Sequence, residues 1–463
     1  MRNFLLTLVA FFAGAVAQAQ TPTPEQANTR VAELLNGADY VTLAAELPAV
    51  REMVVKPLLA LADALVAHCE GRFEDSNRAI EEVARYPEEL GQGTIFGMYN
   101  YALINNLCIE NYAQGADVAR QLLASLPDTD EAEASRRGLL SLLRWMDALT
   151  DRGRVEVVRA RRDVTIPVER RPIGRGEHLI VKATANGVSQ DFIFDTGCSH
   201  ANFISRDVAE RLGVEIVADS IITQGVGGSG YVQLGVLPEM RLGDVVIKNP
   251  TFLVAEHFIP EHVKVEGMCE AALGTHIIRA LGEVRYERKA ECMVLPAKPS
   301  ATEQRNIICD NGTYYLVCHQ AGEQLLLHFD TGNVKSQLST RYFARFQRQV
   351  EAEGGDVERS RSGGFGGVVW NDVRTLPSVE LQVGKRSVML HQVAVDISDG
   401  SSLVSYDGSA GMDLLTASER VTFDLDKMFY RIDKYNGKTL SSSALSPALA
   451  GGLSACCEPP LLS

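Results

Sequence analysis

The sequence lacks the motifs of several common enzyme classes. It has no Gly-x-Ser-x-Gly nucleophile motif, no phosphate-binding loop ending in Lys-Ser or Lys-Thr, and no His-Glu-x-x-His zinc motif. None of its nine cysteines belongs to a Cys-x-x-Cys pair, and no histidine spacing suggests zinc. We therefore expect no serine hydrolase site, no nucleotide cofactor and no metal.

Positive charge and long apolar runs are also scarce. The net charge of −14 over 463 residues argues against nucleic acid or anionic membrane as a partner. Residues 1–20 predict a secretory signal peptide, with Arg2 before the apolar run 4–17 and small-x-small cleavage sites ending at Ala17 and Ala19. The alternative is a buried N-terminal helix. No later run is apolar enough to cross a membrane, so we expect an exported protein, periplasmic or extracellular.

Cysteine pairing stays open at this point. Cys69 with Cys108, or Cys269 with Cys292, are candidate disulfides for an exported chain, and scattered buried thiols are the alternative. Residues 311–313 form an Asn-Gly-Thr glycosylation sequon, which we interpret instead as a hairpin turn.

Residues 21–150 show helical periodicity and predict an α-helical, repeat-like domain. Phe73 and Tyr112, which are 39 residues apart, each lie where one expected helix of a pair gives way to the next. The pattern is similar to degenerate tetratricopeptide repeats, and an irregular helical bundle is the alternative. Residues 151–175 are rich in arginine and predict a linker or an edge strand. The arginines fit a solvated face or packing against acidic residues better than an acidic partner.

Two apolar runs that end in Asp-Thr-Gly are the strongest signal in the sequence. Residues 192–197 form the first and residues 327–332 the second, so that Asp195 and Asp330 lie 135 positions apart. A carboxylate at the end of a buried strand is costly unless something holds its charge. The same costly arrangement twice in one chain indicates that the two carboxylates meet.

The similarity between the two halves continues along the chain and indicates an internal duplication. Four landmarks follow each Asp-Thr-Gly in the same order, at offsets of 137 or 139 residues. They are a glycine run (225–228 and 364–367), a Leu-Pro pair (237–238 and 376–377), an apolar-Gly segment (273–278 and 410–415) and a strand (284–287 and 421–424). Alternating strands before each Asp turn back at 186–187 and 321–322, so a hairpin delivers each carboxylate.

These motifs resemble those of the retropepsin-like and pepsin-like aspartic proteases, over roughly residues 175–433. The resemblance implies an all-β bilobal domain with a first lobe at 176–300 and a second at 301–435. A flexible tail would follow at 436–463. With the helical region, the fold class is multidomain α+β. The second half would make one chain a monomeric pseudo-dimer.

The resemblance also implies the catalytic residues. Asp195 and Asp330 would share one proton and activate a water between them, without a cofactor or a covalent intermediate; the handling of a proton by such a dyad is a known property of this protease class. The supporting residues would be Thr196, Gly197, Thr331, Gly332 and Asn333. The flaps and cleft would bind an extended polypeptide through Gly225, Val226, Gly227, Gly228, Tyr231, His328, Gly364, Phe365, Gly366, Gly367 and Trp370.

Three positions depart from the family pattern. Cys198 and Asn333 follow the two Asp-Thr-Gly motifs, where Ala, Ser or Thr is usual. We expect the Asn333 amide to donate to Asp330, which would leave Asp195 as the protonated partner. His328 shares a strand face with Asp330 and either lines the cleft or is a hydrogen-bonded histidine at its edge. His276 stands where the second copy has Asp413, so the support of the first half is expected to differ.

The sequence therefore predicts a secreted aspartic endopeptidase, with a helical domain that recruits substrate, binds a protein partner or covers the cleft. The alternative from another class is a non-catalytic peptide- or partner-binding protein that uses the helical repeats and keeps a degenerate protease domain. A further alternative is a unit that completes its site by pairing with a second chain.

Overall fold

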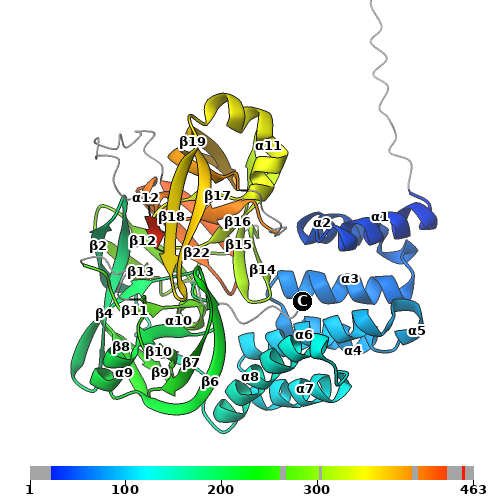
Figure 1. The fold of residues 1–463 in the computed structure, drawn as a ribbon, viewed down its shortest axis with the longest axis horizontal. Coiled ribbons are helices and arrows are strands. Elements are labelled where there is room, and N and C mark those ends of the chain that lie inside the picture. The colour runs from blue at the N-terminus through cyan, green and yellow to red at the C-terminus, as the bar shows by residue number, and fades with distance from the viewer. Residues whose placement is uncertain (1–21, 261–266, 302–304, 399–404, 435–450, 454–463) are drawn as a thin grey trace, which may run out of the picture.

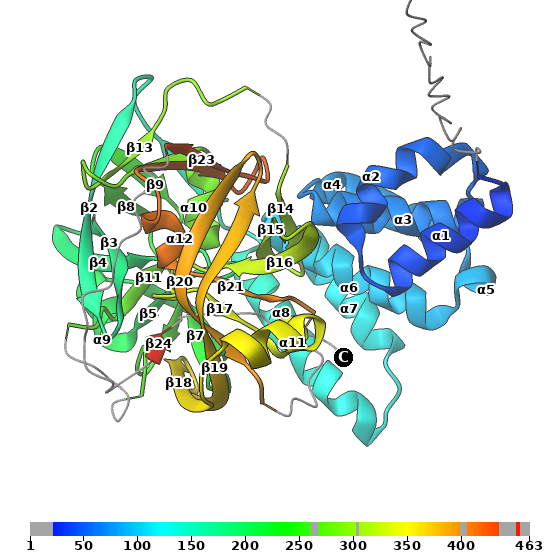
Figure 2. The same cartoon turned by 90° about the horizontal axis from the view of Figure 1, so that it is seen from above.

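The computed structural model describes residues 22–260, 267–301, 305–398, 405–434 and 451–453. A helical domain lies along one side of a β-rich region, as two perpendicular views show (Figures 1 and 2). The multidomain α+β fold expected from the sequence is confirmed. The predicted signal peptide and most of the predicted tail lie outside the described residues. Within them, no helix is long and apolar enough to span a bilayer.

The helical domain packs its helices around two apolar clusters, a small one within residues 27–66 and a larger one that continues into the β-region. Its first helix begins at a capping box, in which Thr23 and Gln26 each accept from the other's backbone N–H. Phe73 and Tyr112 are buried first residues of helices, so both mark the turn of a helical hairpin. The helices are α1 (Pro24–Asn36), α2 (Tyr40–Val50), α3 (Lys56–Cys69), α4 (Phe73–Val83), α5 (Pro87–Leu90), α6 (Gln92–Cys108), α7 (Tyr112–Ser125) and α8 (Glu133–Leu149).

The first lobe follows the helical domain directly. It begins where the spacing of the apolar residues changes from helical to alternating. Its helices are α9 (Arg206–Leu212) and α10 (Thr275–Leu281). Its strands are β1 (Glu156–Val158), β2 (Val164–Ile173), β3 (Gly176–Ala185), β4 (Val188–Phe194), β5 (Asn202–Ser205), β6 (Glu215–Gly225), β7 (Gly228–Val236), β8 (Glu239–Leu242), β9 (Val245–Lys248), β10 (Thr251–Ala255), β11 (Ala271–Leu273), β12 (Val284–Glu287) and β13 (Cys292–Leu295).

The second lobe repeats this order of elements. Its helices are α11 (Thr340–Glu353) and α12 (Met412–Thr416). Its strands are β14 (Ile307–Asp310), β15 (Thr313–Gln320), β16 (Glu323–Phe329), β17 (Gln337–Leu338), β18 (Glu358–Gly364), β19 (Gly367–Val383), β20 (Arg386–Asp396), β21 (Gly408–Ala410), β22 (Arg420–Asp424) and β23 (Phe429–Lys434). Strand β24 (Gly451–Leu453), within the predicted tail, pairs in parallel with β18.

Strand pairing reproduces the duplication seen in the sequence. β11 runs parallel to β4 and antiparallel to β5, and β21 runs parallel to β16 and antiparallel to β17. The two copies join where β12 pairs with β22, with Val284 opposite Phe423. This pairing places the equivalent strand ends of both halves beside each other at the centre of the β-region.

The predicted linker at 151–175 is in large part regular structure, which corrects that expectation. β2 lies between β13 and β3, so it is not an edge strand. Val164, Ile166 and Val168 are buried in alternation with exposed neighbours, and this period of two is what a half-buried strand requires. Arginines of this segment pair with acidic residues of the β-region, including Arg152 with Glu215, in agreement with the intramolecular alternative.

Hydrogen bonds join the helical domain to the β-region at several places, two of which are at α8 and at the turn after β14. The Ile222 N–H of β6 donates to the Ser141 hydroxyl of α8 at 2.8 Å, where the two elements lie side by side (Figure 1). At the second place the turn after β14 reaches the helices. The Asn311 N–H donates to His68 Nε2 at 3.0 Å, and Tyr101 donates to Asp310 at 3.2 Å.

Neither candidate disulfide forms. All seven cysteines within the described part of the chain are free thiols, and Cys269 donates instead to the Asp191 carbonyl. Cys456 and Cys457 lie outside the described residues. Asn311 and Gly312 both have positive φ, at 49° and 82°, so the sequon forms the predicted hairpin turn.

Candidate active site

Each catalytic candidate is delivered by a β-hairpin with a tight turn. Asn186-Gly187 joins β3 to β4, and Ala321-Gly322 joins β15 to β16, with positive φ at all four residues. Turns of this kind match the right-handed twist of the strands and therefore fix their register. Asp195 and Asp330 follow the last residues of β4 and β16, and their N–H groups donate to equivalent carbonyls, Leu273 at 2.9 Å and Ala410 at 3.0 Å.

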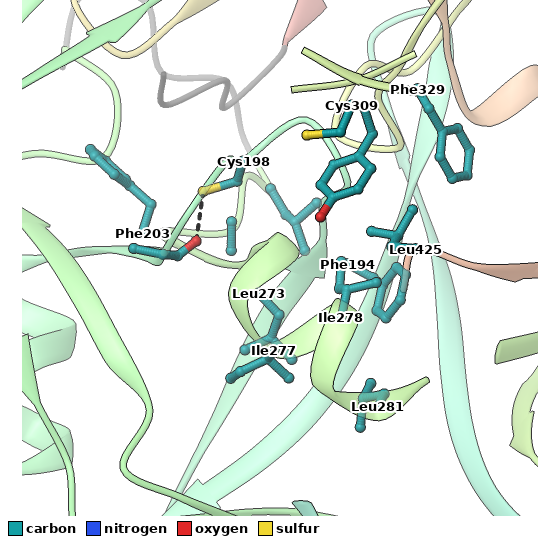
Figure 3. Close-up of a cluster of buried hydrophobic side chains, with 14 of the residues drawn as sticks. Phe194, Cys198, Phe203, Leu273, Ile277, Ile278, Leu281, Cys309, Phe329 and Leu425 are labelled. Carbon is teal, nitrogen blue, oxygen red and sulfur yellow. Dashed lines mark hydrogen bonds between the residues drawn. The ribbon is translucent and has the colours of Figure 1, made fainter. Parts of the chain in front are cut away.

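The threonines of the two motifs bond across the boundary between the lobes. The Thr196 hydroxyl donates to the Phe329 carbonyl at 2.7 Å, and the Thr331 hydroxyl donates to the Phe194 carbonyl at 2.6 Å. Each hydroxyl also accepts from the backbone N–H of the other threonine at 3.0 Å. These four bonds are buried and hold the strand ends in one geometry. Phe194 and Phe329 anchor the same strand ends in the core (Figure 3).

The glycines of the motifs bring the two carboxylates together. A Cβ on Gly197 would lie 2.4 Å from Asp330 Oδ1, and a Cβ on Gly332 would lie 2.5 Å from the Asp195 carboxyl. Each Asp therefore faces the backbone of the opposite motif, where only glycine fits. The Gly197 N–H donates to Asp195 Oδ1 at 2.8 Å, and the Asn333 N–H donates to Asp330 Oδ1 at 3.0 Å.

Burial sets the protonation of this pair. Asp195 is fully buried, and Oδ2 has no hydrogen-bond partner among the described residues. Burial, and after it the Asp330 carboxylate, raise the pKa of Asp195 well above its usual range, against N–H donors such as Gly197. The direction of this shift favours a protonated Asp195, which fits a pair of carboxyls that shares one proton.

The sequence predicted that the side-chain amide of Asn333 donates to Asp330, and this prediction was wrong. The contact from Asn333 to Asp330 comes from its backbone N–H and not from its side-chain amide. The side-chain oxygen of Asn333 accepts from the Lys335 N–H at 3.4 Å instead. Any residue other than proline can supply a backbone N–H, so the identity of residue 333 does not decide which carboxyl is protonated.

Different residues support the two copies, as expected at His276. In the second copy Asp413 accepts from the N–H and hydroxyl of Ser336, whose oxygen accepts from the Gly411 N–H at 3.0 Å. In the first copy Asn202 accepts from the Gly274 N–H at 3.0 Å. The sequence analysis missed Asn202 and Ser336. Asn202 lies seven positions after Asp195, and Ser336 lies six positions after Asp330. A polar residue at this spacing is the sequence feature that could have identified them.

His276 itself connects the first lobe to the helical domain. Its Nε2 lies 3.3 Å from the Thr251 hydroxyl, and its Nδ1 lies 3.8 Å from the Glu110 carboxyl. Burial lowers the pKa of His276 to about 4 and raises the pKa of Glu110 to about 7. Both groups are therefore held towards their neutral forms.

The two glycine runs form flaps whose tips touch. The β6–β7 hairpin turns at residues 225–228 and the β18–β19 hairpin at residues 364–367. The Gly227 N–H donates to the Phe365 carbonyl at 3.0 Å, and a Cβ on Gly227 would lie 2.0 Å from the Gly367 nitrogen. The Phe365 ring packs edge-on against Phe203 at 5.2 Å. The flaps are therefore closed.

The surroundings of three predicted cleft residues are defined in the structure. Tyr231 is 64% exposed and Trp370 is 53% exposed, with the Arg359 guanidinium over the Trp370 ring. His328 is buried beside the Tyr315 ring, and its Nε2 has no hydrogen-bond partner in the described part of the chain. One alternative expected a hydrogen-bonded histidine, but among the described residues no such bond forms at the Nε2 of His328.

Comparison with known proteins gives a match within the first lobe. Residues 181–276 match a family model described as aspartyl protease. No curated protein matches the chain. A retropepsin-like aspartic protease from Rickettsia conorii is 18% identical, with a TM-score of 0.20 over 30% of this chain and 90% of that one.

Two basic 7S globulins are similar over more of the chain. Conglutin gamma, a basic 7S globulin from lupine, is 9% identical, with a TM-score of 0.38 over 60% of this chain and 95% of that one. Basic 7S globulin from soybean is 12% identical, with a TM-score of 0.35 over 58% of this chain and 94% of that one. The segment that carries Asp195 and the first flap is thus the part that matches the aspartyl protease family.

Proposed function

We propose that this protein is an exported aspartic endopeptidase that hydrolyses peptide bonds with a water activated between Asp195 and Asp330. The observation that carries the proposal is the reciprocal placement of the two motifs. Each carboxyl lies against the glycine of the opposite copy, and the two threonines bond across the boundary. This geometry is built within one chain, which favours the pseudo-dimer over pairing with a second chain.

The mechanism follows from the unequal environments of the two carboxyls. Asp195, with its raised pKa, holds the proton and donates it to the carbonyl oxygen of the scissile bond. Asp330 accepts a proton from the attacking water. The tetrahedral species then collapses as a proton passes to the leaving nitrogen. No covalent bond to the protein forms, so the chain needs no nucleophilic side chain at this site.

The flaps control access to this site. Because their tips are hydrogen-bonded to each other and the carboxyls are buried, we expect a polypeptide to enter only after the bond from Gly227 to Phe365 breaks. Closure over an extended peptide would then exclude water from the reaction. The other residues of the two tips are Gly225, Val226, Gly228, Gly364 and Gly366. Tyr231 and Trp370, which are exposed, are available to substrate residues that lie outside the buried centre.

Export rests on the apolar run at 4–17 and its cleavage sites, which predict passage to the periplasm or the extracellular space. The helical domain contacts the first flap through Ser141 and Ile222. We propose that it binds a protein partner or substrate beside the flap.

The test is cleavage of a denatured protein mixture by the mature chain across pH 3 to 8, beside Asp195→Asn and Asp330→Asn. We expect each substitution to abolish cleavage, and a statine-type transition-state mimic to block the parent enzyme. Activity that survives either substitution would exclude a shared pair. Inactivity of the parent chain, together with peptide binding that depends on the helical domain, would favour the non-catalytic binding protein.

A further inference from the structure

The flap hairpins lie at the ends of their sheets, and different elements cover their outer strands. Among the described strands, β6 pairs with β7 alone and ends one sheet, and β18 lies between β19 and the short strand β24 at the end of the other. An uncovered edge strand presents unpaired N–H and C=O groups, which another extended chain can join. Within the described residues both outer strands are covered, and each cover comes from outside the duplicated unit.

The outer strand of the first flap is covered by the helical domain. The Ile222 N–H of β6 donates to the Ser141 hydroxyl at 2.8 Å, and the Arg144 guanidinium donates to the Ser220 carbonyl at 3.3 Å. Both side chains come from α8, which packs along β6 (Figure 1). Backbone groups of this outer strand are therefore bonded to side chains of a helix.

The outer part of the second flap is a two-stranded ribbon apart from β24. β20 pairs with β19 only from Val373 onward, so among the described residues the strand pairing of 367–371 is to β18 alone. A hairpin of two strands is only marginally stable in water, and a third strand stabilises it. The second flap therefore depends on what lies along the other edge of β18.

A short strand from the C-terminal end of the chain lies along that edge. β24 runs parallel to β18, with residues 451–453 opposite residues 361–363 (Figure 2). The paired part of β18 ends at Gly363, two residues before Phe365, whose carbonyl accepts from the Gly227 N–H of the opposite flap. The third strand therefore supports the part of the flap that carries the contact between the tips.

The sequence of β24 indicates a weak and reversible pairing. The strand has three residues, and two of them are glycines. Glycine is depleted in strands and loses the most backbone freedom when it becomes ordered. The 16 residues 435–450 connect β24 to the end of β23 and reach at most about 55–60 Å when extended. Such a tether keeps a weak strand at high effective concentration near the flap, so the strand can detach and pair again.

We propose that residues 451–453 form a detachable strand that braces the second flap in its closed position. The occupant of this edge is the chain's own segment, because its register against β18 is defined over all three residues. Strand addition gains its affinity from main-chain hydrogen bonds, so glycines suffice for the pairing. Release of the strand leaves a two-stranded ribbon that opens more readily. This control of access rests on the proposed peptidase function, whereas the pairing itself does not.

The test compares three forms of the mature chain by amide hydrogen exchange: the parent, a truncation after Ala450 that removes the strand, and a truncation after Leu453 that keeps it. Exchange at residues 361–363 should become about ten-fold faster in the first truncation, because one or two net hydrogen bonds are lost. It should stay at the parental rate in the second. Exchange at Ile222 should be unchanged in both, because α8 covers that flap.

A substitution in the full chain repeats the test without removing the tail. Gly452→Pro removes the N–H at the middle of β24, and it should give the same faster exchange at residues 361–363. Gly437→Pro, which lies in the same tail before the strand, is the matched control and should leave exchange unchanged. A synthetic peptide with the sequence of residues 446–455 should restore protection to the truncation after Ala450.

Peptide cleavage tests the link to activity. Removal of the strand should raise kcat/KM by up to about ten-fold, because a larger fraction of the molecules is open to substrate. Faster exchange with parental kcat/KM would overturn the control of access. Inactivity of every form, the parent included, would count against the proposed peptidase function, and exchange would still decide the pairing.

Three exchange results would overturn the brace, whether or not the chain cleaves peptides. The first is unchanged exchange at residues 361–363 after removal of the strand. The second is equal acceleration in both truncations. The third is protection of the parent chain that is lost on dilution, which would assign the strand to a second copy of the chain.

Discussion

Thr331→Val tests whether the bonds between the motifs hold the two halves together. Valine has nearly the shape of threonine and carries a methyl group in place of the hydroxyl. Two buried bonds are lost: the one donated to the Phe194 carbonyl at 2.6 Å and the one accepted from the Thr196 N–H at 3.0 Å. A carbonyl and an N–H are then left buried without a partner.

The expected magnitude follows from these two groups. A buried polar group without a partner costs about 1–3 kcal/mol, so the two groups together should cost about 2–6 kcal/mol in the free energy of unfolding. Total stabilities of about 5–15 kcal/mol make this a large fraction. The carboxyls also lose their fixed spacing, so kcat for peptide cleavage should fall by more than KM rises.

Urea unfolding, followed by tryptophan fluorescence, measures the stability change, and peptide cleavage measures kcat and KM. Thr416→Val is the control. Thr416 is also buried, but its hydroxyl donates at 3.0 Å to a carbonyl four residues earlier in its own helix, so its loss should cost less than about 1 kcal/mol. Equal destabilisation of the two variants would refute the reasoning.

Three further substitutions test the flaps, the buried carboxyl and the helical contact. Gly227→Ala places a Cβ 2.0 Å from a nitrogen of the opposite flap tip, so kcat/KM for peptides should fall by about ten-fold or more, which is about 1.4 kcal/mol. Asp195→Asn should raise the free energy of unfolding at pH 7 and leave it unchanged at pH 3. The pKa of Asp195 is raised in the folded state, so ionisation destabilises the fold as pH rises above the unfolded value. Ser141→Ala removes the acceptor of the Ile222 N–H, and amide hydrogen exchange at Ile222 should become faster.

Matched controls separate these effects from general damage. Gly93→Ala adds a Cβ where no other atom lies within 4 Å, and it should leave kcat/KM unchanged. Ser125→Ala removes a hydroxyl that bonds only within its own helix, and it should leave exchange at Ile222 unchanged. A Gly227→Ala enzyme with parental kinetics would contradict the closed flap contact. An Asp195→Asn stability difference that is the same at pH 3 and pH 7 would contradict the raised pKa.

Much of the fold could be predicted because its local signals agree with its tertiary structure. Asn186-Gly187 and Ala321-Gly322 were predicted as turns from their composition, and the positive φ values confirm them. The alternation of Val164, Ile166 and Val168 was also present in the sequence, but the neighbouring arginines hid it. The expectation of a linker or an edge strand gave too little weight to this period of two, which decides which face of a strand is buried.

The sequence by itself determined the duplication, the alternating strands and the position of each Asp at a strand end. These features are local, and chain order fixes them. Only the tertiary structure decided that the Asn333 backbone, and not its amide, donates to Asp330, and that His328 packs beside Tyr315. Those contacts depend on how separate segments approach one another, which the packing of the whole core sets and no single segment encodes.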